Sequence, residues 1–262
     1  MRKQKINFSI QFISFLVIIS LAFSFIIGYI WKVLSTADFF SVKQVIVRNS
    51  DYQFEYLKGR NIFDLNLDQE AKKVFLKCPD CRKVRFARVL PNCIVVDFLK
   101  RKPVALVKFY KNFGVDEQGV LFLPDATTED LGLPVIYGLE TKIFSPKLGT
   151  SYQRSELGLA LSIINAFKTN KAFNGFSLKR VDLANPGSAG FFMLLPKQIV
   201  NYTLPFPQAE WLGFEVRIGA NNIAQKMLIL GGLITQERKE WANIKYIDLR
   251  FKEPLIKLSD VK

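Results

Sequence analysis

The chain has 262 residues, of which 49% are apolar and 24 are phenylalanine, so a folded protein with a sizeable core is expected rather than a disordered one. Its formal charge of +14 raises the question of a nucleic-acid partner, which depends on where the charge lies. The absence of histidine excludes Ser-His-Asp and Cys-His catalysis and every His-ligated zinc site.

The first predicted element is a membrane-spanning helix. No charged residue occurs from Ile6 to Trp31, and a spanning helix needs about 20 predominantly apolar residues. Arg2, Lys3 and Lys5 precede this run, so the positive-inside rule predicts a cytoplasmic N-terminus and an exported remainder. We expect a short cytoplasmic tail over 1–9, a transmembrane helix over 10–32, and a single-pass protein of the cell (inner) membrane.

A cleaved signal peptide is the alternative interpretation of this segment. Ser35-Thr36-Ala37 resembles a cleavage site with small residues. However, the apolar run exceeds the roughly 7–15 residues of a signal-peptide core, and Lys32 interrupts the approach to the site. Both features favour an uncleaved anchor. Tyr29 and Trp31 lie at the end of the run, where aromatic residues of a membrane helix meet the outer interface.

Basic residues are concentrated between positions 77 and 111, where only Asp80 and Asp97 are acidic. They are Lys77, Arg82, Lys83, Arg85, Arg88, Lys100, Arg101, Lys102, Lys108 and Lys111. Export would separate this region from DNA and RNA, so we expect no nucleic-acid partner. Two interpretations stay open: a surface for anionic lipids, wall polymers or an acidic protein, and the solvated face of a sheet.

The region after the membrane segment predicts a small sheet with two helices on one face. The expected elements are a strand over 40–49, a short helix over 52–58 closed by Gly59, a helix over 67–77 capped by Asn66, and strands over 83–90 and 92–100. Pro91-Asn92 is the turn between the last two strands. The second helix should bury one face, consisting of Leu67, Ala71, Val74, Phe75 and Cys78.

The C-terminal half predicts a β-rich domain with two helices. Helical spacing of apolar residues marks 155–168 and the segment after Asn221, in which Ile223, Met227, Leu230 and Ile234 recur. The expected strands are 176–183, 190–195, 199–204, 213–218, 244–251 and 255–258. The predicted fold class is therefore α+β behind one N-terminal transmembrane helix.

Candidates for catalysis are few. Asp116 and Glu117 lie in a predicted hairpin rather than a cleft, and no glycine-rich phosphate loop occurs. Cys78 and Cys81 form a lone C-x-x-C, accompanied only by Cys93, which makes structural thiols or a minor disulfide the favoured interpretation. At helical spacing their side chains are too far apart for a disulfide unless the helix unwinds at Pro79. We expect no catalytic, cofactor-binding or metal-binding residue.

Five short motifs resemble the FtsQ/DivIB family of bacterial cell-division proteins. Residues 88–96 (RVLPNCIVV) resemble its R-x-x-P-N turn, residues 101–105 (RKPVA) its E-R-x-P-V-A stretch, residues 115–122 (VDEQGVLF) its V-D-x-x-G-x-x-F hairpin, residues 133–138 (LPVIYG) its L-P-x-I-x-G, and residues 246–251 (YIDLRF) its V-D-L-R-Y. The motifs occur in the family's order behind one N-in transmembrane helix, and the resemblance covers nearly the whole chain. Lys100 stands where the family often has Glu, and Phe251 replaces the usual Tyr.

The resemblance implies a POTRA domain over 40–108 and a β domain over 109–262 that carries C-terminal partner-binding strands. It also implies a non-enzymatic scaffold that recruits and aligns other divisome proteins at the division septum, with short bitopic partners of the FtsB and FtsL type.

The final strand is the expected binding surface, because an edge strand offers unpaired main-chain groups to a partner. The residues expected to bind a partner are Arg250, Phe251, Lys252, Leu255, Ile256, Lys257 and Leu258. The alternative for Phe251 and Arg250 is a core ring and a solvated rim charge.

Two other functions compete with the scaffold. A POTRA protein of envelope assembly or secretion should carry a C-terminal membrane barrel, and the region after Phe176 is too short for eight spanning strands. An exported cell-wall enzyme would need an acid–base pair or a metal cluster, which the sequence does not indicate.

Overall fold

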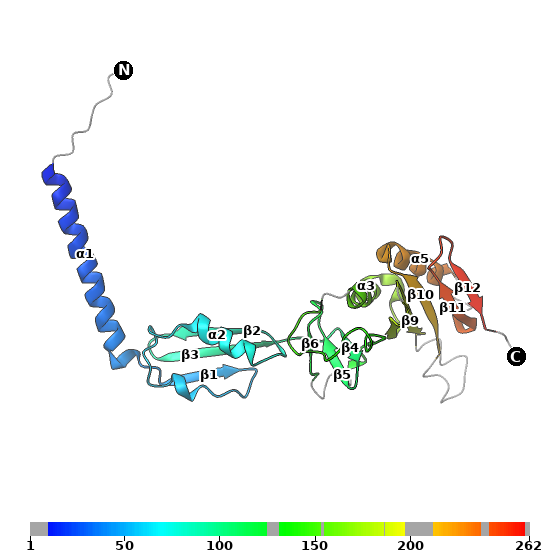
Figure 1. Cartoon of the computed structure of the whole chain (residues 1–262), viewed down its shortest axis with the longest axis horizontal. Helices are drawn as coiled ribbons and strands as arrows, with labels where there is room; N and C mark the ends of the chain where they lie inside the picture. Colours follow the sequence, from blue (N-terminus) through cyan, green and yellow to red (C-terminus); the bar gives the residue numbers. More distant parts are fainter. Residues whose placement is uncertain are drawn as a thin grey trace, which may run out of the picture. The chain divides into compact units, whose positions relative to one another are not determined.

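The structure is a computed structural model that describes residues 10–124, 131–152, 155–185, 187–196, 212–236 and 241–259. The chain divides into two compact units, Met1–Lys100 and Arg101–Lys262. Each unit has a hydrophobic core of its own. Figure 1 shows their elements in chain order.

The first element, α1, runs from Ile10 to Thr36. Its stretch from Phe12 to Leu34 has a mean hydropathy of 2.5 and no buried residue, so it is long and apolar enough to cross a membrane. No other helix in the described part of the chain meets that criterion. The helix extends four residues beyond the predicted end at residue 32 and includes Ser35 and Thr36 of the possible cleavage site.

The folded part of the first unit is a three-stranded sheet with one α-helix, α2, packed against strand β2. Its elements are β1 (Gln44–Arg48), α2 (Leu67–Leu76), β2 (Cys81–Val89) and β3 (Cys93–Lys100), with short 3-10 helices at Asp38–Phe40 and Glu55–Leu57. The strand order is β1-β3-β2: β3 pairs parallel with β1 and antiparallel with β2. Asn66 caps α2 as predicted, because its side-chain oxygen accepts a hydrogen bond from the backbone N–H of Gln69.

The predicted helix over 52–58 is wrong. Only a single 3-10 turn forms, at Glu55–Leu57, although Gly59 does take the predicted positive φ of 77°. The aromatic side chains before that turn explain the difference, because they pack on the sheet instead of following a helix. The Tyr52 ring stacks 5.5 Å from Phe98, and the Phe54 ring meets Phe86 edge-on at 5.4 Å.

The buried face of α2 also differs from the prediction. Leu67 and Val74 are buried as expected, but Phe75 is exposed and Glu70 is buried. Glu70 tolerates burial because it accepts a hydrogen bond from the Tyr56 hydroxyl at 2.7 Å and pairs with Lys73 at 2.9 Å. The polar side chain on the inner face therefore serves to attach the segment around residue 56 to α2.

The second unit contains a nine-stranded sheet in the order β12-β11-β10-β9-β8-β7-β4-β5-β6. Its strands are β4 (Ala105–Lys108), β5 (Asn112–Val115), β6 (Leu121–Phe122), β7 (Val135–Tyr137), β8 (Ser177–Asp182), β9 (Ser188–Leu194), β10 (Gly213–Gly219), β11 (Ile244–Asp248) and β12 (Leu255–Leu258). The helices are α3 (Ser155–Thr169) and α5 (Ile223–Gln236), with 3-10 turns at Lys171–Phe173 and Trp241–Asn243. The predicted strand over 199–204 lies outside the described residues.

Alternating burial along the central strands produces one core. Phe191 and Met193 of β9 and Phe214 and Val216 of β10 point to the same side and pack with residues of α3 and α5. The predicted fold class is confirmed: an N-terminal apolar helix precedes a mixed α and β structure rich in strands. Along the chain, the first unit ends at Lys100, eight residues before the boundary expected at 108. The reason is that β4 pairs with β5 and β7 of the larger sheet and so belongs to the second unit.

Candidate functional site

The candidate binding surface is the last strand, β12, which lies at one end of the nine-stranded sheet. It pairs antiparallel with β11, and no described strand pairs with its other side. All four of its residues are exposed, including Leu255 and Leu258, each at 48%. An apolar strand with a free main-chain edge can accept an added strand.

The segment between β11 and β12 adds an exposed aromatic ring. Phe251 is 63% exposed and is therefore not a core residue. The Arg250 guanidinium lies 5.8 Å from the centre of the Phe251 ring. Lys252 and Lys257 are exposed as well. All seven residues predicted to bind a partner thus lie on the described surface, within one hairpin.

Arg250 is held by a partner within the chain. Its Nε and Nη2 atoms donate to the Asp248 carboxylate at 3.0 and 2.6 Å, and Asp248 is 3% exposed. The hydrogen bond from Arg250 holds the pKa of Asp248 below its usual range, and the same bond raises the pKa of Arg250. The sequence reasoning missed Asp248. Its position two residues before Arg250 was the available signal, because residues i and i+2 of an extended strand share a face.

A polar cavity of about 310 Å³ lies beside this ion pair. It is lined by Asp182, Asn185, Ser188, Ala189, Gly190, Glu215, Arg217 and Arg250. Arg217 lies 4.3 Å over the Tyr246 ring and pairs with Glu215 at 3.1 Å, and the hydrogen bond from Glu215 raises the pKa of Arg217. These residues come from different segments of the chain, and the order of the strands in the sheet brings them together. No sequence motif indicates that they are close in space.

Two of the basic residues predicted to form one face make polar contacts within the protein. Arg88 donates to the backbone carbonyl oxygens of Ile62 and Leu65 at 2.8 and 2.6 Å, which fixes the segment before α2. Arg101 is buried and pairs with Asp116. Arg82, Lys83, Arg85 and Arg88 on β2 are exposed, so burial removes Arg101 from the charged surface but leaves these four residues on it.

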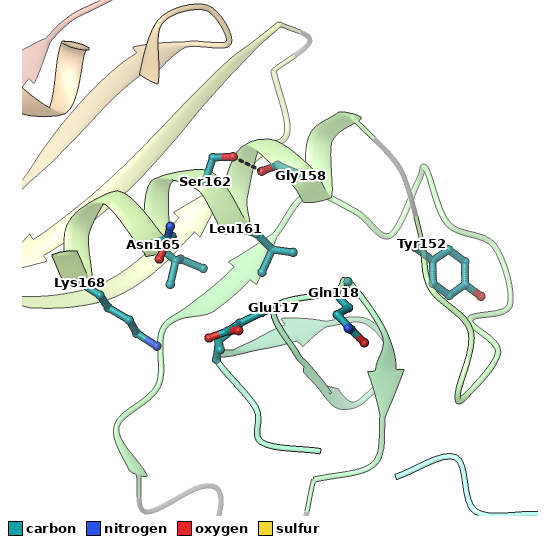
Figure 2. Close-up of a pocket in the computed structure, with 11 residues that line it drawn as sticks. Glu117, Gln118, Tyr152, Gly158, Leu161, Ser162, Asn165 and Lys168 are labelled. Carbon is teal, nitrogen blue, oxygen red and sulfur yellow. Dashed lines mark hydrogen bonds between the residues drawn. The ribbon is translucent and has the colours of Figure 1, made fainter. Parts of the chain in front are cut away.

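Figure 2 shows a groove of about 510 Å³ in the second unit, between the turn after β5 and helix α3. Glu117 and Gln118 of the turn line this groove together with Asn165 and Lys168 of α3, and the Lys168 side chain points toward Glu117. The expectation that Glu117 lies away from any cleft is therefore wrong, because the β5–β6 turn packs beside α3. Glu117 is the only carboxylate among the described lining residues, so this part of the groove holds no carboxylate pair for acid–base chemistry.

Cys78 and Cys81 form a disulfide, with Cα atoms 5.3 Å apart. Helix α2 ends at Leu76, so Cys78 lies beyond the helix and Cys81 opens β2. The helical spacing that argued against a bond does not apply here. Cys93 is a free thiol.

The chain is similar to curated proteins named Cell division protein FtsQ. It is 26% identical to that of Koribacter versatilis over 200 residues, 23% identical to that of Geotalea daltonii over 242, and 21% identical to that of Syntrophotalea carbinolica over 225. These matches cover 76%, 87% and 83% of this chain, respectively, and 52%, 80% and 73% of the relatives. The chain thus spans about half the length of the first relative. No family model matches the chain. The resemblance to the FtsQ family is confirmed by these relatives.

Proposed function

We propose that this chain is a single-pass membrane protein of cell division that works as a scaffold rather than an enzyme. Its similarity to three proteins named Cell division protein FtsQ supports a role in cell division. Helix α1 supports the anchor, because Phe12–Leu34 is long and apolar enough to span a bilayer. Its folded part would recruit and align other division proteins at the septum.

The first folded unit corresponds, in this proposal, to a POTRA domain. The order β1, α2, β2, β3 and the sheet order β1-β3-β2 support that interpretation, although one of the two expected helices is reduced to a 3-10 turn. The second unit would be the β domain that carries the main binding surface.

The observation that carries the binding role is the outer edge of β12, with which no described strand pairs. A partner strand added there would form main-chain hydrogen bonds along Leu255–Leu258, and exposed apolar side chains would give it contact area. Phe251 is placed to act as an aromatic anchor. From the family resemblance, the partners are short bitopic division proteins of the FtsB and FtsL type.

Proline substitutions at two adjacent positions of β12 test the proposed strand addition. Successive N–H groups of a strand point to opposite sides, so I256P and K257P each remove one, and only one of the two faces the free edge. We expect the outward-facing proline to abolish capture of the partner from membrane extracts while the full chain keeps its circular dichroism spectrum. I256A and K257A, which retain the N–H, are the matched controls.

Side-chain substitutions separate the contribution of the Phe251 ring from that of the β12 main chain. F251A should weaken partner capture at least tenfold, as truncation of an aromatic hot spot does, whereas L228A on the exposed face of α5 should have no effect. R250E would place a second carboxylate against buried Asp248, so R250Q is the cleaner test of this position. Unchanged capture in folded F251A and in both proline variants would reject β12 as the binding surface.

A further inference from the structure

We propose that a chain of aromatic rings at the end of α1 rests in the interfacial layer of the bilayer and holds the first folded unit on the membrane surface. The rings belong to Trp31, Phe63, Phe40 and Phe39, and we call them the aromatic cluster. The occupant of this surface is lipid. The inference goes beyond the partner binding proposed above and depends only on α1 spanning the membrane.

Direct contacts join the folded unit to the end of α1. The Asn61 side-chain amide donates to the backbone carbonyl of Leu34 at 2.9 Å. That carbonyl is one of the last four of the helix, and no N–H group within a helix donates to its last four carbonyls. The Trp31 ring lies 6.2 Å from the Phe63 ring, so a second contact forms one turn earlier.

The aromatic cluster continues from that contact to the surface. Phe63 meets Phe40 at 5.1 Å, and Phe40 meets Phe39 at 5.1 Å, both edge-on. Phe40 and Phe63 pack against the core of the first unit. Phe39 is 64% exposed, and it lies in the 3-10 turn that follows α1. Insertion into the interfacial layer would remove the apolar surface of this ring from water.

The length of α1 places these rings at the edge of the bilayer. The 23 residues of Phe12–Leu34 measure about 35 Å along the helix axis, against about 30 Å for the hydrocarbon core. Leu34 therefore lies close to the interface, where aromatic side chains concentrate. Phe39 follows five residues later, within a unit that is bound to the same helix end.

The charges near the cluster are mixed. Lys32, Lys43 and Arg60 are exposed, and so are Asp38 and Asp64. The backbone N–H of Val42 donates to the Arg60 carbonyl at 2.9 Å, so these charges lie close to the ends of the segments that carry the rings. Three cations against two anions leave only a small net charge, so the rings rather than anionic headgroups should drive the association.

Fluorine NMR of the full chain in lipid nanodiscs tests the proposal. 4-Fluorophenylalanine is introduced at position 39, and in a second sample at Phe144, a ring of the second unit that is 82% exposed. We expect the signal from position 39 to be lost with a lipid spin-labelled near its headgroup and to persist with a water-soluble gadolinium chelate. The signal from position 144 should be lost with the chelate.

Lipid composition separates the ring mechanism from charge. The protection at position 39 should be the same in phosphatidylcholine nanodiscs and in nanodiscs that also contain phosphatidylglycerol. Loss of the position 39 signal with the aqueous chelate in both types of nanodisc would overturn the proposal and leave the cluster as a surface for another protein. Protection only with the anionic lipid would also overturn it, in favour of Lys32, Lys43 and Arg60.

Discussion

Arg101 and Asp116 form a buried ion pair that joins the start of the second unit to the turn after β5. The other carboxylate oxygen of Asp116 accepts backbone N–H bonds from Gln118 at 2.9 Å and Val120 at 3.0 Å. Arg101 comes from the R-K-P-V-A stretch and Asp116 from the V-D-E-Q-G hairpin. Two separate family-like motifs therefore meet in one structural contact, which defines the turn that forms a wall of the groove.

Removing one member of this pair should strongly destabilise the second unit. D116N leaves the Arg101 charge buried without a counter-ion, at a cost of about 3–5 kcal/mol. The thermal midpoint should fall by roughly 10 °C, measured by calorimetry of the full chain in detergent. E215Q, which breaks the half-exposed pair with Arg217, is the control and should cost about 0–1 kcal/mol. Equal effects in the two variants would contradict the structural role of Asp116.

The Tyr56–Glu70 hydrogen bond predicts a pH dependence for the first unit. Burial, followed by the bond to Glu70, raises the pKa of Tyr56 to about 12, while the bond from Tyr56 lowers the pKa of Glu70. The stabilisation from Glu70 should be present above its unfolded pKa of about 4.3 and be lost as pH falls through the lowered folded pKa. The stabilisation from Tyr56 should be present below its unfolded pKa of about 10 and be lost as pH rises towards 12.

Carboxyl NMR titration of the full chain in detergent checks this coupling. In Y56F, the Glu70 pKa should rise towards its ordinary value, because the hydroxyl donor is gone. Y110F removes the hydroxyl of an exposed tyrosine in the other unit and should leave the Glu70 pKa unchanged. A Glu70 pKa that does not move in Y56F would show that the cations Lys73 and Arg60 keep it low without the Tyr56 hydroxyl.

Gly138 should not tolerate a side chain. Its φ is 85°, and an added Cβ would lie 2.4 Å from the backbone nitrogen of Ala184. G138A should therefore destabilise the second unit by more than about 2 kcal/mol. In α3, Gly158 has no atom within 4 Å of an added Cβ, so G158A should stabilise the unit by about 0.5–1 kcal/mol. Chemical unfolding of both variants measures the difference, and equal stabilities would refute the close packing at Gly138.

The disulfide should matter for stability rather than for binding. C78A/C81A removes the cross-link of a four-residue loop, which contributes about 2 kcal/mol in the chain-entropy model. We expect a lower thermal midpoint with unchanged partner capture, while C93A, which removes the free thiol, should retain both. Loss of capture by a folded double mutant would assign the cysteine pair a role in binding.

The basic residues before α1 predict its orientation. A reporter active only outside the cytoplasm should work when fused after Lys262 and fail when fused before Met1, because the positive-inside rule predicts that Arg2, Lys3 and Lys5 stay on the cytoplasmic side. N-terminal sequencing of the mature protein should find no cleavage after Ala37. A new N-terminus at Asp38 would indicate a secreted form instead of an anchored one.

The sequence by itself determined the features that depend on neighbouring residues. An uninterrupted apolar run specifies α1, Asn66 specifies the start of α2, and helical spacing specifies α3 and α5, since each signal acts within a few turns of one segment. The helix predicted over 52–58 does not form, because its local signals were outweighed by contacts with distant residues. Local caps favoured a helix there, but the rings of Tyr52 and Phe54 gained more by packing on Phe98 and Phe86.

The tertiary structure alone decided the features that depend on strand order. Asp116 receives Arg101 only because β4 and β5 pair, and Arg217 reaches Tyr246 only because β10 lies beside β11. The exposure of Phe251 likewise follows from the position of β12 at the end of the sheet. Pairing between distant strands is selected by the packing of the whole core, so no local pattern of residues encodes it.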